Sequence, residues 1–317
     1  MNRREFLKQA ALAGLGAVAL SGCRGSGPAG PGPKVGRNRW QAGPVNGVDL
    51  VVARRSEAAE AVRAALQPFG GMASFVRRGD RVLIKPNLAW ARLPEQGACT
   101  SPEVLRAVIE ACQEAGAASI VVGDHTCDSA RVVFDLTGAR EVCRQCGVPL
   151  VDYSPRSYYR PIRISGGGGI QEDEVVADAL NCDVYINLPT LKHHATSHVT
   201  LALKNQMGLI RDRQRYHSAK RGTEADNLHR NIVDLATALR PTLNILDGTR
   251  ALKTNGPKGP GLVEDLGLVC ASPNICAVDA YGARLLGYDP AEIPHIVLAS
   301  QAGLGTFDLD AITLKEV

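Results

Sequence analysis

The chain has 317 residues, of which 45% are hydrophobic and 21% are charged, and this is the composition of a globular protein rather than of a disordered or fibrous one. Only 4% of the residues are aromatic and the formal net charge is +4, to which the three basic residues Arg3, Arg4 and Lys8 contribute against Glu5. Because a nucleic-acid partner requires clustered basic residues or aromatic stacking platforms, this composition excludes one. The sequence also contains no apolar run of the roughly 18 residues that a membrane-spanning helix needs.

The first 23 residues have the features of an export signal. Arg3 and Arg4 precede a mildly apolar stretch, as in twin-arginine signals. The sequence Leu20-Ser21-Gly22-Cys23 resembles a bacterial lipobox, whose cysteine is lipidated and becomes the mature N-terminus. We therefore expect an extracytoplasmic protein that is carried by the twin-arginine machinery and attached to the membrane at Cys23. Two alternatives are simple cleavage without lipidation and a cytosolic amphipathic helix.

Residues 24–47 are rich in glycine and proline and predict a linker without a core of its own. A single α/β domain is expected over residues 48–317. Short β-branched runs predict strands at 48–53, 81–85, 119–122, 148–151, 183–188, 243–246 and 266–270. Helical spacing and capping residues predict helices at 56–67, 101–116, 140–146, 227–239 and 275–286.

The alternation of strands and helices indicates the fold class. Several of the predicted strands are continuous apolar runs, which is typical of strands that are covered on both faces. We therefore predict an α/β fold with a mainly parallel sheet covered by helices on both faces, and with an inserted region around residues 155–230.

Polar residues follow several of these strands, at the edge of the sheet where α/β proteins bind ligands. Asp and Asn in such places are also common turn residues, whereas lysine is not. The residues that follow strands or their extensions are Lys85, Asn87, Asp124, Lys192, His193 and Asp247. Together they predict a cleft lined by Lys, Asn, Asp and His.

His194 and His198 are four residues apart, and on a helix they would share one face and could bind one divalent metal ion. Without a helix, the same side chains would contact an anionic ligand or lie together on the surface by chance. The Glu of a His-Glu-x-x-His metalloprotease motif is absent, which argues against zinc-protease chemistry.

Lys204 lies within the apolar segment Leu201–Gly208, and a buried lysine there would need a partner. The partner would be a carboxylate, such as Asp124 or Asp247, or an anionic substrate; the alternative is a lysine whose charge reaches the surface. The glycine-rich turn 255–261 carries Lys258 and could hold an anion, but it has neither the ending of a P-loop nor the glycine spacing of a Rossmann turn.

The nine cysteines do not predict a metal cluster. Cys143 and Cys146 form a Cys-x-x-Cys pair, whereas a ferredoxin-type cluster needs four closely spaced cysteines. The pair is interpreted as a disulfide, a redox pair or two buried small residues.

A set of segments in chain order resembles the domain of unknown function 362 family. These segments are Lys85-Pro86-Asn87-Leu88, Thr100-Ser101-Pro102-Glu103, Gly123-Asp124, Leu203–Gly208, Asp247-Gly248, Asn255–Gly259, Ala277–Ala280 and Leu286-Gly287-Tyr288. The resemblance covers about residues 48–312. It implies an association with iron–sulfur modules, although this chain lacks the cysteine quartet. A fainter similarity to the nickel-pincer lactate racemase group implies an anionic substrate.

These observations predict a protein that binds or transforms a small anionic molecule. One form of this hypothesis includes a divalent metal ion at the site. Alternatives are an iron–sulfur-associated electron-transfer partner and a ligand-binding lipoprotein without chemistry. The expected catalytic residues are His194, His198, Lys204 and Asp124, and the two histidines are also the expected metal ligands. The expected ligand-binding residues are Lys85, Asn87, Lys192, His193, Asn205, Asp247, Lys258 and Asp279.

Overall fold

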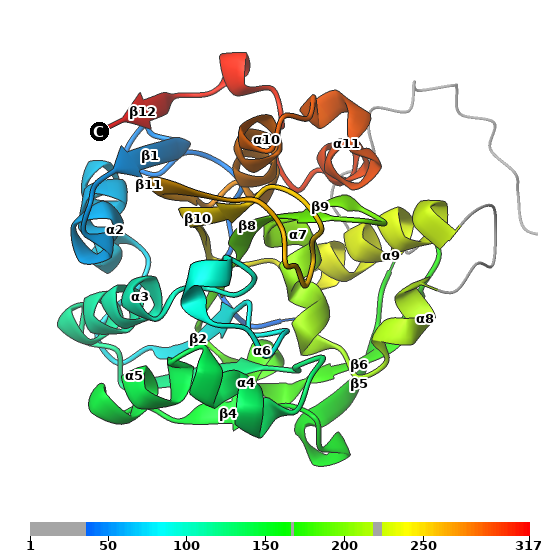
Figure 1. The fold of residues 1–317 in the computed structure, drawn as a ribbon, viewed down its shortest axis with the longest axis horizontal. Helices are drawn as coiled ribbons and strands as arrows, with labels where there is room; N and C mark the ends of the chain where they lie inside the picture. The colour runs from blue at the N-terminus through cyan, green and yellow to red at the C-terminus, as the bar shows by residue number, and fades with distance from the viewer. Residues whose placement is uncertain (1–35, 166–167, 218–223) are drawn as a thin grey trace, which may run out of the picture.

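The structure is a computed structural model that describes residues 36–165, 168–217 and 224–317 (Figure 1). The predicted signal and Cys23, the predicted site of lipidation, lie outside the described residues.

The sheet is mainly parallel, as predicted from the sequence. Its strands follow the order β12-β1-β11-β10-β7-β2-β3-β4. Their bounds are β1 Leu50–Arg54, β2 Arg81–Pro86, β3 Ser119–Asp124, β4 Leu150–Asp152, β7 Val184–Leu188, β10 Leu243–Leu252, β11 Val263–Ser272 and β12 Leu314–Glu316. Only β11 runs antiparallel to its neighbours in this path, so the sheet is mixed at that side. From β10 through β7, β2 and β3 to β4 every pairing is parallel, so the carboxyl ends of these strands lie along one edge.

The remaining described strands form a hairpin beside β10 and a separate small sheet. The strand β8 (Thr190–His194) pairs with β10 and forms a hairpin with β9 (His198–Thr200). A separate two-stranded sheet consists of β5 (Tyr159–Arg163) and β6 (Glu172–Val176).

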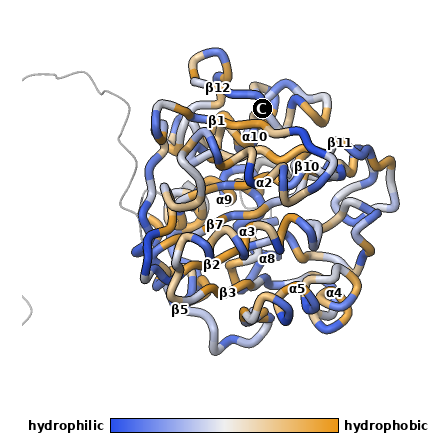
Figure 2. The backbone as a smooth tube through the Cα atoms, turned by 90° about the vertical axis from the view of Figure 1, so that its left-hand side faces the viewer, coloured by the Kyte–Doolittle hydropathy of each residue, from blue (hydrophilic) through white to orange (hydrophobic). Residues whose placement is uncertain are grey.

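Helices cover both faces of the sheet. Successive apolar side chains of a strand point to opposite faces, so both faces are apolar and both need to be covered. In β2, Val82 and Ile84 pack on one side while Leu83 packs on the other. The Val82 side is covered by α2 (Ala58–Leu66), α3 (Pro102–Glu114), α4 (Ala130–Leu136) and α5 (Ala139–Gln145). The Leu83 side is covered by α6 (Ala177–Asn181), α7 (Ala202–Asn205), α8 (Arg213–His217), α9 (Glu224–Ala238), α10 (Ile275–Leu285) and α11 (Pro294–Gln301). Figure 2 shows the central strands mostly in the hydrophobic colours.

Two features of the domain layout differ from expectation. The region 155–230 is not one insertion, because β7 within it is a central strand between β10 and β2. Part of the predicted linker packs on the domain: the buried Asn38 donates a hydrogen bond to the Arg240 carbonyl, and Arg240 lies over the Trp40 ring at 4.5 Å. The folded part therefore begins before Val48, because these side chains find polar and aromatic partners that composition does not reveal.

Candidate functional site

A cavity of about 520 Å³ opens where β2, β3 and β8 end. This volume is within the range of sites for small organic ligands. Seven of the predicted site residues line it: Lys85, Asn87, Asp124, Lys192, His194, Lys204 and Asn205. The parallel register explains this convergence, because β2 pairs directly with both β3 and β7 and so brings their polar ends together.

Lys85 and Asp124 form a buried ion pair at the ends of neighbouring strands. The Lys85 Nζ lies 2.9 Å from Asp124 Oδ1, and each side chain is almost completely buried. The Lys85 Nζ also donates to Asn205 Oδ1 at 3.1 Å, and the Asn205 Nδ2 returns a bond to the Lys85 carbonyl. Burial lowers the pKa of Lys85 and the adjacent Asp124 carboxylate raises it, with burial the larger effect. The charge of Lys85 is thus balanced within the protein.

Gly208 closes over this ion pair and has no room for a side chain. A Cβ at position 208 would lie 1.9 Å from Asp124 Oδ1 and 2.4 Å from Lys85 Cε. The Gly208 carbonyl accepts a hydrogen bond from the His125 N–H, which holds the segment against β3.

Lys192 has neutral partners. Its Nζ donates to Asn87 Oδ1 at 3.1 Å and to the Ala98 carbonyl. The side chain is buried, and burial lowers its pKa to about 8. A hydrogen-bonded but unpaired buried ammonium of this kind is a natural contact for an anion.

Lys204 has the fewest partners of the three lysines. It lies on α7, and the one hydrogen bond of its Nζ among the described residues is to Met207 Sδ at 3.5 Å. Burial lowers its pKa to about 8. Neither predicted carboxylate reaches it, because Asp124 pairs with Lys85 and Asp247 accepts from the Ser101 and Thr249 N–H groups. The alternative of a surface lysine is wrong, since the side chain is buried.

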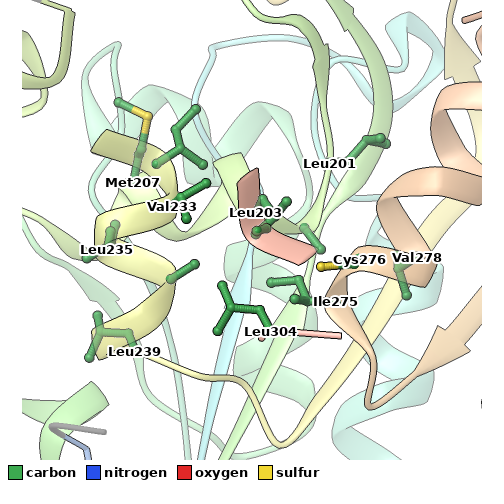
Figure 3. Packing of buried hydrophobic residues seen from close by; sticks show 14 of the residues in the cluster. Leu201, Leu203, Met207, Val233, Leu235, Leu239, Ile275, Cys276, Val278 and Leu304 are labelled. Atoms are coloured by element: carbon green, nitrogen blue, oxygen red, sulfur yellow. The ribbon is translucent and has the colours of Figure 1, made fainter. Parts of the chain in front are cut away.

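The packing of α7 explains why Lys204 is held at the cavity although this helix has only four residues. Leu203 lies between side chains of α9 and α10, near Val233 and Ile275 (Figure 3). Asp279 of α10 accepts hydrogen bonds from the Ala202 and Leu203 N–H groups at the start of α7. Asp279 was predicted to bind ligand, but its carboxylate holds this helix start instead.

His194 and His198 do not share a helix face, so the helical version of the metal prediction is wrong. They are cross-strand partners in the β8–β9 hairpin. The His194 Nδ1 accepts hydrogen bonds from the Thr196 and Ser197 N–H groups, so the ring proton lies on Nε2. Burial, and then Lys204 and Lys192, lower the pKa of His194 to about 2, so the ring is neutral and donates through Nε2.

The ring of His198 has other neighbours. Its centroid lies 5.7 Å from that of Tyr288 and 6.5 Å from that of His229, and His198 does not line the cavity. Within the described residues no group of three His, Cys, Asp or Glu side chains is placed to hold a metal ion. Cys143, which is buried, and Cys146, which is half-buried, are not joined by a disulfide.

The remaining predicted ligand-binding residues lie outside the cavity lining. The His193 Nδ1 accepts from the Gly256 N–H and so joins the hairpin to the glycine-rich turn. Lys258 in that turn lies 5.3 Å from the Trp90 ring centroid and 3.8 Å from Asp128, while Pro257 lines the cavity. Asp247 binds backbone at the start of α3.

The sequence interpretation missed several polar residues of the cavity, among them Arg213 and Thr200. Arg213 lines it and donates to the His125 and Thr126 carbonyls and to Cys127 Sγ, all of which are neutral groups. Thr200 lines it with a buried hydroxyl that has no hydrogen-bond partner in the described part of the chain. The dense basic run Arg211-Asp212-Arg213-Gln214-Arg215 was a signal for Arg213, whereas nothing in the sequence singled out Thr200.

Comparison with known proteins places the chain in a family. The profile described as Domain of unknown function (DUF362) matches residues 82–284. The chain belongs to this family. A relative, the thylakoid-associated protein sll1697 of Synechocystis sp., is 33% identical over 264 residues, which are 82% of this chain and 80% of the relative.

Among solved structures, the lactate racemase apoprotein from Thermoanaerobacterium thermosaccharolyticum resembles the chain with a TM-score of 0.44 and 13% identity. The similarity covers 76% of this chain and 58% of that structure. In the described part of this DUF362 chain, no helix is long and apolar enough to span a membrane.

Proposed function

We propose that the cavity binds a small carboxylate or phosphate anion. The observation that carries this proposal is an excess of positive charge: Lys192, Lys204 and Arg213 line the cavity, and none of the three contacts a carboxylate within the described residues. Because an unpaired buried charge is costly, a cavity of this kind is stabilised by an anion that enters it. The neutral His194 and the hydroxyl of Thr200 add hydrogen-bond donors for the same ligand.

We also propose that this binding takes place outside the cytoplasm. The support is the paired Arg3 and Arg4, the apolar stretch after them and the lipobox that ends at Cys23. The name of the 33% identical relative, thylakoid-associated protein sll1697, is consistent with a membrane-attached role.

Calorimetric titration tests the binding proposal. Malonate and inorganic phosphate are titrated into the wild-type protein and into Lys204→Met, with Lys258→Met as the matched control because Lys258 lies outside the cavity lining. We expect at least one anion to bind, with a dissociation constant that rises about tenfold or more, or about 1.4 kcal/mol, in Lys204→Met and stays unchanged in Lys258→Met. The proposal is wrong if neither anion binds, or if both variants bind like the wild type.

A further inference from the structure

Three lysines line one cavity, and their ammonium groups have different surroundings. The Lys85 Nζ contacts three oxygen atoms, of Asp124, Asn205 and Pro86. The Lys192 Nζ donates to two oxygen atoms, of Asn87 and Ala98. The Lys204 Nζ has only the Met207 sulfur, at 3.5 Å, among the described residues. Thioether sulfur is a weak acceptor, so Lys204 is the lysine whose charged form the protein stabilises least.

Lys204 is also the most accessible of the three. It keeps 8% of its surface exposed, whereas Lys85 and Lys192 keep 1% each. Its side chain lines the cavity, so a ligand in the cavity can approach the nitrogen. An amine with a free lone pair and an open approach is a nucleophile for carbonyl carbon.

We propose that Lys204 forms an imine with a small anion that carries an aldehyde or ketone beside its carboxylate, that is, a 2-oxo acid. The proposal rests on the anion-binding function above and specifies its ligand class. The carboxylate would lie against Lys192 and Arg213, whose charges have no carboxylate partner within the described chain. The carbonyl carbon would then lie at Lys204.

The protonation of Lys204 supports this assignment. Burial, with smaller contributions from Lys192 and Arg213, lowers its pKa from the usual 10.5 to about 8. A larger fraction of Lys204 than of an ordinary lysine therefore carries the neutral amine near neutral pH. A cationic neighbour and desolvation are the two devices that activate lysine nucleophiles.

The step needs no oxidant or reductant. The neutral Nζ of Lys204 attacks the carbonyl carbon, a C–N bond forms, and one N–H proton passes to the carbonyl oxygen to give a carbinolamine. A second proton, from solvent, lets this oxygen leave as water, and the nitrogen keeps its remaining hydrogen in a protonated C=N bond. The protonated iminium keeps one positive charge at the site of the original ammonium, so the charge match with the bound carboxylate is preserved. The N–H of His194 and the hydroxyl of Thr200, which line the same cavity, are donors for the carbinolamine oxygen.

Reductive trapping tests the proposal. The full-length protein is incubated with glyoxylate or 2-oxoglutarate and then with sodium borohydride, which reduces an imine to a stable secondary amine, and the modified lysine is located by peptide mass mapping. We expect one adduct, at Lys204. The exposed or half-buried Lys253, Lys258 and Lys315 are internal controls for non-specific reaction. Lys204→Arg keeps the positive charge but is not a nucleophile, so it should form no adduct.

The outcomes separate this inference from the binding function. If malonate binds by calorimetry and no adduct forms at Lys204 in the wild type, the imine inference is wrong and anion binding stands. If adducts appear equally on the three control lysines, the inference is wrong as well. If neither malonate nor phosphate binds and no adduct forms, both proposals fail. Should Lys204→Arg not fold, the mapping of the wild-type protein decides the question alone.

Discussion

Lys85, Lys192 and Lys204 have the same side chain, but the fold places different atoms beside each Nζ. Lys85 has a carboxylate, Lys192 has two neutral oxygens, and Lys204 has a sulfur. Because burying an ammonium without an anion is costly, Lys192 and Lys204 lower the free energy of unfolding of the unliganded protein. An anionic ligand in the cavity would supply the missing negative charge and offset this cost.

At the residue scale, anion affinity should depend on pH through Lys192 and Lys204. Burial lowers the pKa of both to about 8, so the cations are present below this pH and are lost as the pH rises through it. Calorimetry between about pH 7 and pH 9.5 should show malonate affinity falling across about pH 8, whereas ordinary lysines would keep it constant to about pH 10. An affinity that does not change over this range contradicts the assignment of these two lysines.

Gly208→Ala should disrupt the ion pair beneath it. The added methyl group would lie 1.9 Å from Asp124 Oδ1, so either the Lys85–Asp124 pair or the backbone must move. We expect the free energy of unfolding to fall by about 1–3 kcal/mol, the usual cost of an overpacked core. The measurement is urea denaturation. Gly43→Ala is the control, because no atom lies within 4 Å of the Cβ that it would add, and an equal loss in both variants would refute the argument.

At the element scale, the four-residue helix α7 depends on packing and on Asp279 rather than on its own length. A helix this short is not stable by itself, since the first turn is the costly one. Asp279 satisfies two of its free N–H groups, and Leu203 is fixed between α9 and α10 (Figure 3). The position of Lys204 therefore depends on residues that are distant in the sequence.

The role of Asp279 predicts a specific pH dependence of stability. Burial raises its pKa to about 7 in the folded protein, from the model-peptide value of 3.8. A raised acid pKa contributes stability that is complete below about pH 4 and is lost as the pH rises through about 7. The free energy of unfolding of the wild type should therefore fall between about pH 4 and pH 8. In Asp279→Asn this contribution is absent, because the asparagine side chain does not ionise, so the difference between the two proteins should change over this range. Urea denaturation at several pH values measures this difference, and a constant difference would show that the carboxylate is not buried as described.

At the scale of the whole molecule, export and attachment can be tested separately from the cavity. Replacing Arg3 and Arg4 by lysine should block export, because the twin-arginine machinery recognises the pair. Cys23→Ala should abolish incorporation of labelled palmitate and release the exported protein from the membrane fraction, with malonate affinity unchanged. Cell fractionation and metabolic labelling report these outcomes. Membrane attachment that persists in Cys23→Ala would contradict the lipid anchor.

The sequence determined the α/β class, most of the strands and the chemistry of the cavity residues. Apolar runs and helical spacing are local properties, so β2, α3, α9 and α10 could be predicted close to their final bounds. Polar residues at strand ends pointed to Lys85, Asp124 and Lys192 because the binding edge of a parallel sheet is a general feature.

Which of these groups meet depends on the tertiary fold. The neighbours of β2 in the sheet are set by long-range pairing, and this pairing places Asp124 beside Lys85 and leaves Lys204 without a carboxylate. The same applies to His194 and His198, whose spacing fits a helix although the chain forms a hairpin there. Spacing along the chain limits only local geometry. The partner of a buried charge can come from a distant segment, as Asn205 lies 120 residues from Lys85.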